Sequence, residues 1–590
     1  MRRMFVAALM IAALVGGRDS VATVRQAQDS RGWIEQSNRH AKVLLDALAR
    51  FAPEGAGQLG VSGLDEEVTN LTAERIRLRH ETLKTALATL QDLAKQEQHP
   101  LVRQDLEILM RSARNGIRAL ELGQARLLPY TDVTALVFGG LRSLLDAQVP
   151  PERRKAALVR LGKYAGTVPA YEPMASQATA RTRARLGDAK LLMPARSQVE
   201  RDLNNAPILR QGIAKLFEQY QLDGWREPFQ ALEAQLTAYE SFVRAEVLPR
   251  ARTDFRLPPD LYALALDQVG VDIPPDRLAA MARDAFREIQ GEMQRLAPEV
   301  AKARGFDATD YREVIRALKK EQLVGEAILP HYRKRLEQLE AIIEREHLVT
   351  LPQRAARIRI ATDAEAAQSP APNMRPPRLL GNTGEMGEFV LPLNIPAPPG
   401  SAAAKQTFDD FTYAAASWTL TAHEARPGHE MQFAKIIEAG VSVPRAVFAF
   451  NSTNVEGWGL YAEWIVQPFM PPDGRLISLQ FRLMRAARAF LDPELHLGRI
   501  SPDEARRVLR DDVVLSEAMT EQEVERYTFR APAQATSYFY GYTQLRALRP
   551  EVEKTMGDKF KARTFHDFIL AQGLLPPELL RAAVLDHFRP

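Results

Sequence analysis

Apolar residues recur at three- and four-residue spacing through most of the first 350 residues, and this periodicity limits the fold more than any other feature. Such spacing is typical of amphipathic helices that bury one face. Breaks such as Pro150-Pro151 and Pro258-Pro259 separate the segments, and no repeat period links them. We therefore predict an array of helices over residues 25–350, with the clearest segments at 73–96, 101–122, 153–164, 230–248 and 331–347.

The pattern changes at residues 363–400, where prolines surround the apolar run 387–394. This run predicts an isolated strand, and Pro392 favours an edge position because proline donates no ladder hydrogen bond. Helical patterning returns at 407–433, 453–467, 475–492, 502–511 and 534–548. We therefore expect a mainly α fold with a small β-sheet near the active site. Its parts are an N-terminal helical region (23–362) and a C-terminal metal-binding region (363–590), which we expect to form one continuous domain.

The N-terminus has the pattern of a secretory signal peptide. Two arginines precede the apolar stretch 4–17, and Ser20-Val21-Ala22 supplies small residues for cleavage, so we predict a signal peptide at 1–22. A membrane anchor is the alternative, but about 20 apolar residues are needed to span a bilayer. The stretch is shorter, and no Cys follows it to carry a lipid. We expect a periplasmic or secreted protein with no stable membrane insertion after cleavage.

Composition excludes several kinds of site. Lys and Arg total 78 against 74 for Asp and Glu, and no basic run is present, so we expect no nucleic-acid partner. The absence of Cys excludes disulfides, thiolate metal sites and Cys nucleophiles. A metal must then bind to His, Asp and Glu. Half of the 10 histidines lie in the last 170 residues: His423, His429, His496, His566 and His587.

The segment 422–432 is a variant of the zinc-peptidase helix. In the usual H-E-x-x-H form, two histidines at i and i+4 share a helix face and bind one metal, while the Glu faces the attacking water. Here His429 follows His423 by six residues, which on an unbroken helix separates the two rings by roughly 120°. Pro427-Gly428 lies between them, and a bulge there would bring the rings together. The alternative is a pair of surface histidines beside a helix end.

A catalytic zinc site needs a third protein ligand and an open position. The segment 454–464 offers Glu456, which shares a helix face with Leu460 and Glu463. The alternative is an exposed charged stripe. Gly457 and Gly459 flank Trp458 and disfavour an ordinary exposed helix, so we expect close packing against another helix.

Stabilising an oxyanion requires hydrogen-bond donors, and Tyr538 and His496 are the candidates. The alternative for Tyr538 is core packing with its hydroxyl at the rim, and for His496 a structural histidine with both nitrogens satisfied. A ligating His also needs an orienting partner, for which Asp492, Glu463 and Asp567 are candidates.

In these segments the sequence resembles the bacterial family catalogued as domain of unknown function 885, which is grouped with the gluzincin-like metallopeptidases. The resemblance rests on five ordered blocks: H-E-x-x-P-G-H-x-x-Q at 423–432, E-G-W-x-L-Y-A-E at 456–463, D-x-x-L-H at 492–496, P-x-Q-x-x-S-Y-x-x-G at 532–541 and F-H-D at 565–567. It implies that His423, His429 and Glu456 bind one Zn2+ per chain and that Glu424 is the catalytic base.

We therefore expect an exported zinc-dependent hydrolase, a metallopeptidase that acts on a peptide or small amide through a metal-activated water. The strand at 387–394 would align the substrate by edge pairing. Two alternatives stay open. One is a catalytically silent binding protein on a metallopeptidase fold, and the other is a metal-dependent hydrolase of a non-peptide amide or ester.

Overall fold

The computed structural model describes residues 16–397 and 406–589, and describes side chains within 32–397 and 408–589. Most of the predicted signal peptide, residues 1–15, lies outside this range. Among the described residues, no helix combines the length and apolar character that crossing a membrane requires. The expected mainly α fold with a small sheet is confirmed.

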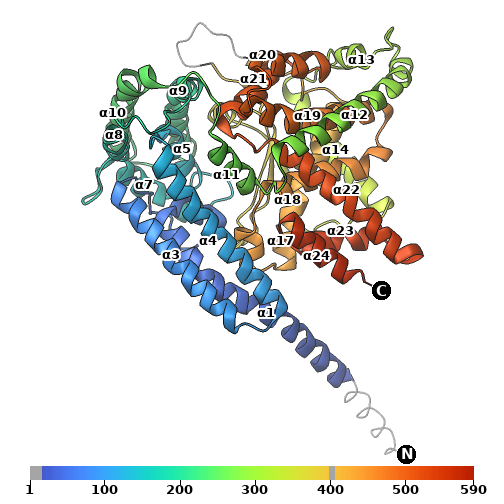
Figure 1. Cartoon of the computed structure of the whole chain (residues 1–590), viewed down its shortest axis with the longest axis horizontal. Helices are drawn as coiled ribbons and strands as arrows, with labels where there is room; N and C mark the ends of the chain where they lie inside the picture. The colour runs from blue at the N-terminus through green and yellow to red at the C-terminus, as the bar shows by residue number, and fades with distance from the viewer. Residues whose placement is uncertain (1–15, 398–405, 590) are drawn as a thin grey trace, which may run out of the picture.

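Helices form both halves of the chain (Figure 1). The first half contains α1 (Gly16–Phe51), α2 (Pro53–Leu59), α3 (Ala73–Gln96), α4 (Pro100–Arg126), α5 (Val133–Arg142), α6 (Pro151–Arg154), α7 (Ala156–Ala165), α8 (Met174–Arg183), α9 (Arg196–Gln219), α10 (Arg226–Phe242), α11 (Pro259–Val269), α12 (Pro275–Arg304), α13 (Tyr311–Leu318) and α14 (Ile328–Arg345). The second contains α15 (Asp363–Gln368), α16 (Ala416–Glu424), α17 (His429–Ala439), α18 (Ser452–Val466), α19 (Pro472–His496), α20 (Pro502–Arg507), α21 (Glu517–Glu525), α22 (Thr536–Met556), α23 (Ala562–Ala571) and α24 (Pro577–His587).

The periodic segments form helices because their apolar residues reach a core. In α4, the buried residues Val102, Leu106, Leu109 and Ala113 follow the three- and four-residue spacing of one helix face. The predicted segment 73–96 coincides with α3, and 101–122 lies inside α4. The segment 407–433 is an exception, because helix begins only at Ala416 and is broken after Glu424.

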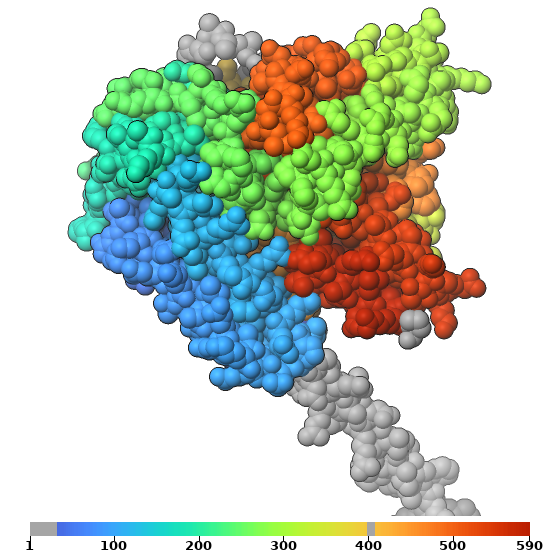
Figure 2. Space-filling model, viewed as in Figure 1, coloured from blue at the N-terminus to red at the C-terminus, as the bar shows by residue number. Residues whose placement is uncertain are grey.

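The main core crosses the expected boundary at residue 362. Phe286 and Met293 of α12 share one apolar cluster with Leu483 and Phe490 of α19, and the rings of Phe286 and Phe490 lie 5.5 Å apart. Figure 2 shows a second junction, where α4 in blue meets the red C-terminal helices; there Arg111 forms an ion pair with Glu578 of α24. The two halves are therefore packed against each other at more than one place.

The strand prediction was wrong about position. β3 (Glu388–Leu391) is the central strand of a three-stranded sheet, parallel to β1 (Arg357–Ile360) and antiparallel to β2 (Asn373–Arg375). Pro392 follows the last paired residue, so its missing N–H removes no bond from the ladder. Because both sides of β3 are paired, it has no free edge to align a substrate. β4 (Asn394–Ile395) and β5 (Gln406–Thr407) form a separate pair.

Candidate metal centre

His423 and His429 meet because one helix ends and another begins between them. α16 ends at Glu424 and α17 starts at His429, with a cis peptide bond at Arg426-Pro427 in the connection. A Cβ at Gly428 would lie 1.9 Å from the carbonyl oxygen of His423, so only glycine fits this close turn. The imidazole rings lie 4.6 Å apart between centroids. The break in the helix, rather than a bulge within one helix, overcomes the six-residue spacing.

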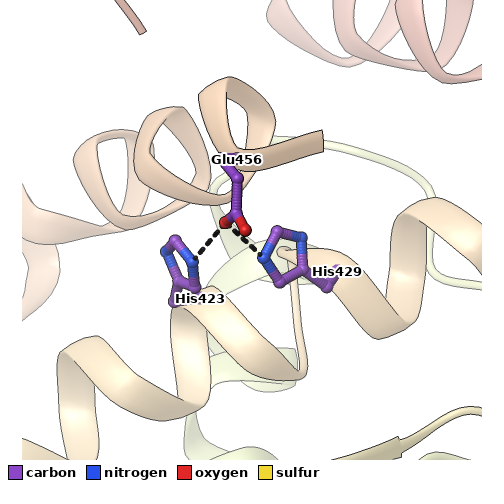
Figure 3. A group of neighbouring side chains, drawn as sticks. All are labelled: His423, His429 and Glu456. Atoms are coloured by element: carbon purple, nitrogen blue, oxygen red, sulfur yellow. Dashed lines mark hydrogen bonds and ion pairs between the residues drawn. The ribbon is translucent and has the colours of Figure 1, made fainter. Parts of the chain in front are cut away.

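Glu456 of α18 completes the group (Figure 3). Its Oε2 lies 3.2 Å from His429 Nε2 and 3.5 Å from His423 Nε2, and one ligand atom from each residue lies within 4.8 Å of the others. Burial opposes a charge on Glu456, but its hydrogen bonds with His423 and His429 hold the pKa of this carboxyl well below its usual range. Two imidazole nitrogens and one carboxylate oxygen are a donor set that suits catalytic zinc.

Two glycines let α18 approach the histidines. A Cβ at Gly459 would lie 2.7 Å from His423 Cε1 and 2.8 Å from His429 Cε1. A Cβ at Gly457 would lie 2.6 Å from the backbone of Gly541 in α22. Trp458 between them is buried and donates its indole N–H to the carbonyl of Pro427 at 2.9 Å. The expected close helix packing is present, and the exposed-stripe alternative is excluded.

Glu463, one of three candidate orienting residues, holds His423. His423 Nδ1 donates to Glu463 Oε1 at 2.7 Å, which leaves Nε2 directed at Glu456. Glu463 is only 1% exposed, accepts a second bond from Thr419, and lies 3.4 Å from Arg485. A carboxylate behind a histidine in this way fixes the ring and its tautomer in metal sites.

The other two orienting candidates lie in different networks. Asp492 accepts hydrogen bonds from the Tyr262 hydroxyl and the Ala533 amide. Asp567 accepts from the amide and hydroxyl of Thr350. Neither bond set includes His423 or His429, so Glu463 alone fills the role among the three.

Glu424 has the surroundings of a general base. It follows His423 in the chain, is 7% exposed, and has no hydrogen-bond partner among the residues described. Burial raises the pKa of its carboxyl to about 8, an effect that His429 opposes and Glu456 reinforces. A divalent cation on the three candidate ligands would oppose this rise and favour the ionised carboxylate that a base requires. The side chain is therefore held near the candidate ligands without being engaged elsewhere.

Tyr538 of α22 lies against the same group. Its ring stacks on His423 at 6.0 Å with an angle of 14° between the planes. Its hydroxyl accepts a hydrogen bond from Arg526 Nη2 at 2.8 Å, so its own proton remains available to a further acceptor. The Arg488 guanidinium lies 4.6 Å from the ring centroid. Burial raises the pKa of Tyr538, so the hydroxyl stays protonated at neutral pH.

His496 is placed differently. Its Nδ1 accepts from the amide of Leu257 at 3.1 Å, its Nε2 donates to the carbonyl of Tyr527 at 2.9 Å, and its ring stacks on Tyr262. Burial lowers the pKa of His496 to about 4. Both nitrogens are occupied by backbone groups, so the ring has no donor for an oxyanion. These contacts favour a structural role for His496 over the catalytic role predicted from the sequence.

A cavity of about 690 Å³ opens onto this centre between the two halves of the chain. Glu456 and Tyr538 line it from one side, and residues of α5 and α9 line it from the other. Three arginines that line the cavity were not predicted as site residues from the sequence: Arg201, Arg526 and Arg530. The four-residue spacing of Arg526 and Arg530, just before the 532–541 block, was an available signal. Nothing local marks Arg201, because it reaches the cavity only through tertiary packing.

Comparison with known proteins identifies relatives but no activity. The family described as bacterial protein of unknown function (DUF885) matches residues 53–584. A solved structure of a proposed lipoprotein of unknown function from Shewanella oneidensis is 19% identical, with a TM-score of 0.70, over 93% of this chain and 99% of the other. A proposed lipoprotein from Colwellia psychrerythraea is 18% identical, with a TM-score of 0.74, over 94% and 99%. Among curated proteins, none matches this chain.

Proposed function

The chain belongs to the DUF885 family of bacterial proteins, whose function is unknown, and from its metal centre we propose that it is a zinc-dependent hydrolase that cleaves peptide bonds. The observation that supports this proposal is the convergence of His423, His429 and Glu456 beside an unengaged Glu424. Glu456 and Tyr538 line a cavity of the size that small-ligand sites have. A relationship to the gluzincin-like metallopeptidases is part of the same proposal.

The chain supplies each group that such a reaction needs. A zinc ion bound by the three ligands would lower the pKa of a water and polarise a substrate carbonyl. Glu424 accepts the proton of the attacking water and passes it to the leaving amine. Tyr538, whose hydroxyl is positioned by Arg526, donates a hydrogen bond to the carbonyl oxygen as negative charge develops on it. Glu463 keeps the ring of His423 in the orientation that metal binding requires.

Export is a second part of the proposal. The signal-peptide pattern of residues 1–22 supports it, and the two similar structures are proposed lipoproteins. Fractionation of cells that express the full chain tests this part. A mature protein that lacks the first residues and lies outside the cytoplasm is expected, whereas a full-length cytoplasmic product would contradict export.

Metal content per chain is the first test of the centre. Mass spectrometry of the purified protein should find one zinc per chain, and the double variant His423→Ala, His429→Ala should lose it. A matched double variant at two histidines outside the centre, His80→Ala with His99→Ala, should keep it. Zinc that stays in the first variant, or never binds the wild type, would refute the ligand assignment and favour the silent binding protein.

Product analysis then addresses the substrate class. Zinc-loaded protein is incubated with a panel of short peptides and with a matched panel of non-peptide amides and esters. Cleavage of the peptides supports the proposal, and cleavage confined to the second panel would replace it with the non-peptide hydrolase.

A further inference from the structure

The cavity beside the candidate metal ligands is lined by arginines from two parts of the chain. Arg201 comes from α9, and Arg526 and Arg530 come from the single-turn π-helix η7 (Arg526–Arg530) that follows α21. Arg201 pairs with Glu525 and is hydrogen-bonded to Gln522, which places α9 beside the end of α21. Figure 1 shows α9 and α21 on facing sides of the two halves.

These arginines differ in how far their charge is already neutralised. Arg201 has Glu525 as an ion partner, and Arg526 lies 3.8 Å from Glu523. Arg530 is hydrogen-bonded to the neutral side chain of Gln522, and no carboxylate lies within ion-pair distance of it in the described part of the chain. Arg530 is also exposed on the cavity wall. It therefore has guanidinium donors free for an anionic ligand.

None of the described acidic residues of the cavity pairs with Arg530, and Glu456 is held by His423 and His429. Glu523 is held by a two-bond contact with Arg488, at 2.6 Å for each bond. Asp202 accepts from Tyr130, and burial together with the nearby Asp132 raises the pKa of Asp202 to about 8, so it is mostly protonated at neutral pH. Burial raises the pKa of Asp132 to about 6, so this residue is mostly ionised at neutral pH, but its carboxylate accepts from the amide of Ala135 at 3.0 Å at the start of α5.

Arg526 and Arg530 line the same cavity as Glu456 and Tyr538. Arg526 donates to the hydroxyl of Tyr538, and the ring of Tyr538 stacks on His423. Arg530 lies four residues further along the turn, a spacing that separates side-chain origins by roughly 5–6 Å. An extended peptide covers about 3.3 Å per residue. An anion on Arg530 would therefore lie roughly one or two extended residues from Arg526, in the cavity that Glu456 and Tyr538 also line.

From this arrangement we propose that Arg530 binds the C-terminal carboxylate of a short peptide, so that the enzyme releases C-terminal residues. The planar guanidinium matches a carboxylate through two parallel hydrogen bonds, which makes arginine well suited to this ligand. The inference rests on the proposed peptidase function for its cleavage step, but the binding step can be measured without turnover.

The test is fluorescence anisotropy with labelled pentapeptides and full-length protein kept in chelator, so that no cleavage occurs. Three peptides share one sequence except at the end: a free C-terminal carboxylate, a C-terminal amide, and an amide whose last residue is Asp. We expect the free acid to bind about tenfold more tightly than either amide. Arg530→Gln should reduce this preference to about twofold or less, and Arg530→Lys should restore part of it.

Arg510→Gln, at an exposed arginine outside the cavity, is the matched control and should keep the full preference. Equal binding of acid and amide, a preference that survives Arg530→Gln, or no binding of any peptide would overturn the inference. Equal binding of the free acid and the Asp-terminated amide would also overturn it, because the site would then not distinguish the chain end. If the acid is preferred but zinc-loaded protein cuts none of the peptides, the hydrolase proposal fails and the carboxylate site stands.

Discussion

A single methyl group placed at Gly459 should weaken zinc binding without altering any ligand. The Cβ of Gly459→Ala would lie 2.7 Å from His423 Cε1, 2.8 Å from His429 Cε1 and 2.9 Å from His423 Nε2. Ordinary contact begins at 3.4 Å, so the rings or α18 must move by several tenths of an ångström. Metal–ligand distances tolerate only about 0.2 Å. We therefore expect zinc affinity to fall by about 10- to 100-fold, the range seen when ligand orientation is disturbed.

The same contact should lower stability, since forcing atoms into a packed site typically costs about 1–3 kcal/mol. Zinc affinity is measured by competition with a chromophoric chelator, and the free energy of unfolding by urea titration of the metal-free protein. Gly123→Ala in α4 is the control, because a Cβ there meets nothing within 4 Å. It should leave zinc affinity unchanged and raise stability by up to about 1 kcal/mol. Wild-type zinc affinity in Gly459→Ala would refute the packing argument.

Three further predictions concern the centre and its surroundings. Glu424→Gln should reduce turnover by at least about 100-fold while zinc content stays at one per chain, and activity retained in this variant would rule out the assigned base. Glu463→Gln should weaken zinc binding by about 10- to 100-fold in the chelator assay, and unchanged affinity would mean that the bond to His423 Nδ1 does not position the ring. Burial lowers the pKa of His566 to about 4, so as the pH falls the unfolded chain binds a proton at a higher pH than the folded protein does. The free energy of unfolding should therefore decrease between about pH 6.5 and pH 4, by up to about 3 kcal/mol. Urea titrations of wild type and His566→Gln across this range should show a steeper loss in the wild type, whereas equal losses would contradict this source of acid sensitivity.

The parts of the structure that were predictable depend on local patterns. Helix α3 has the predicted bounds because its apolar residues repeat with the period of a helix. The candidate ligands could also be predicted from the sequence, since His423, Glu424 and His429 lie within seven residues and the glycines around Trp458 indicate close packing. The way in which the histidines meet could not be predicted, because the helix break depends on the conformation of residues 426–428.

The parts that were missed depend on contacts between distant segments. β3 is central because residues 357–360 and 373–375 pair with its two sides, and neither pairing follows from the run 387–394 itself. The ring nitrogens of His496 are hydrogen-bonded to the backbone of Leu257 and Tyr527. Both residues are distant in the sequence, so the D-x-x-L-H block does not predict these bonds. The role of His496 could therefore not be predicted from residues 492–496 alone.

The division of the cavity between the two halves of the chain has a consequence for how relatives diverge. All three candidate metal ligands come from residues 423–456, whereas α5 and α9, which form the facing wall, come from residues 133–219. Substitutions on the facing wall can alter which molecules enter the cavity without changing the three candidate ligands. Under the proposed function, selectivity and reactivity can thus drift independently during evolution, and two proteins with an identical centre need not share a substrate.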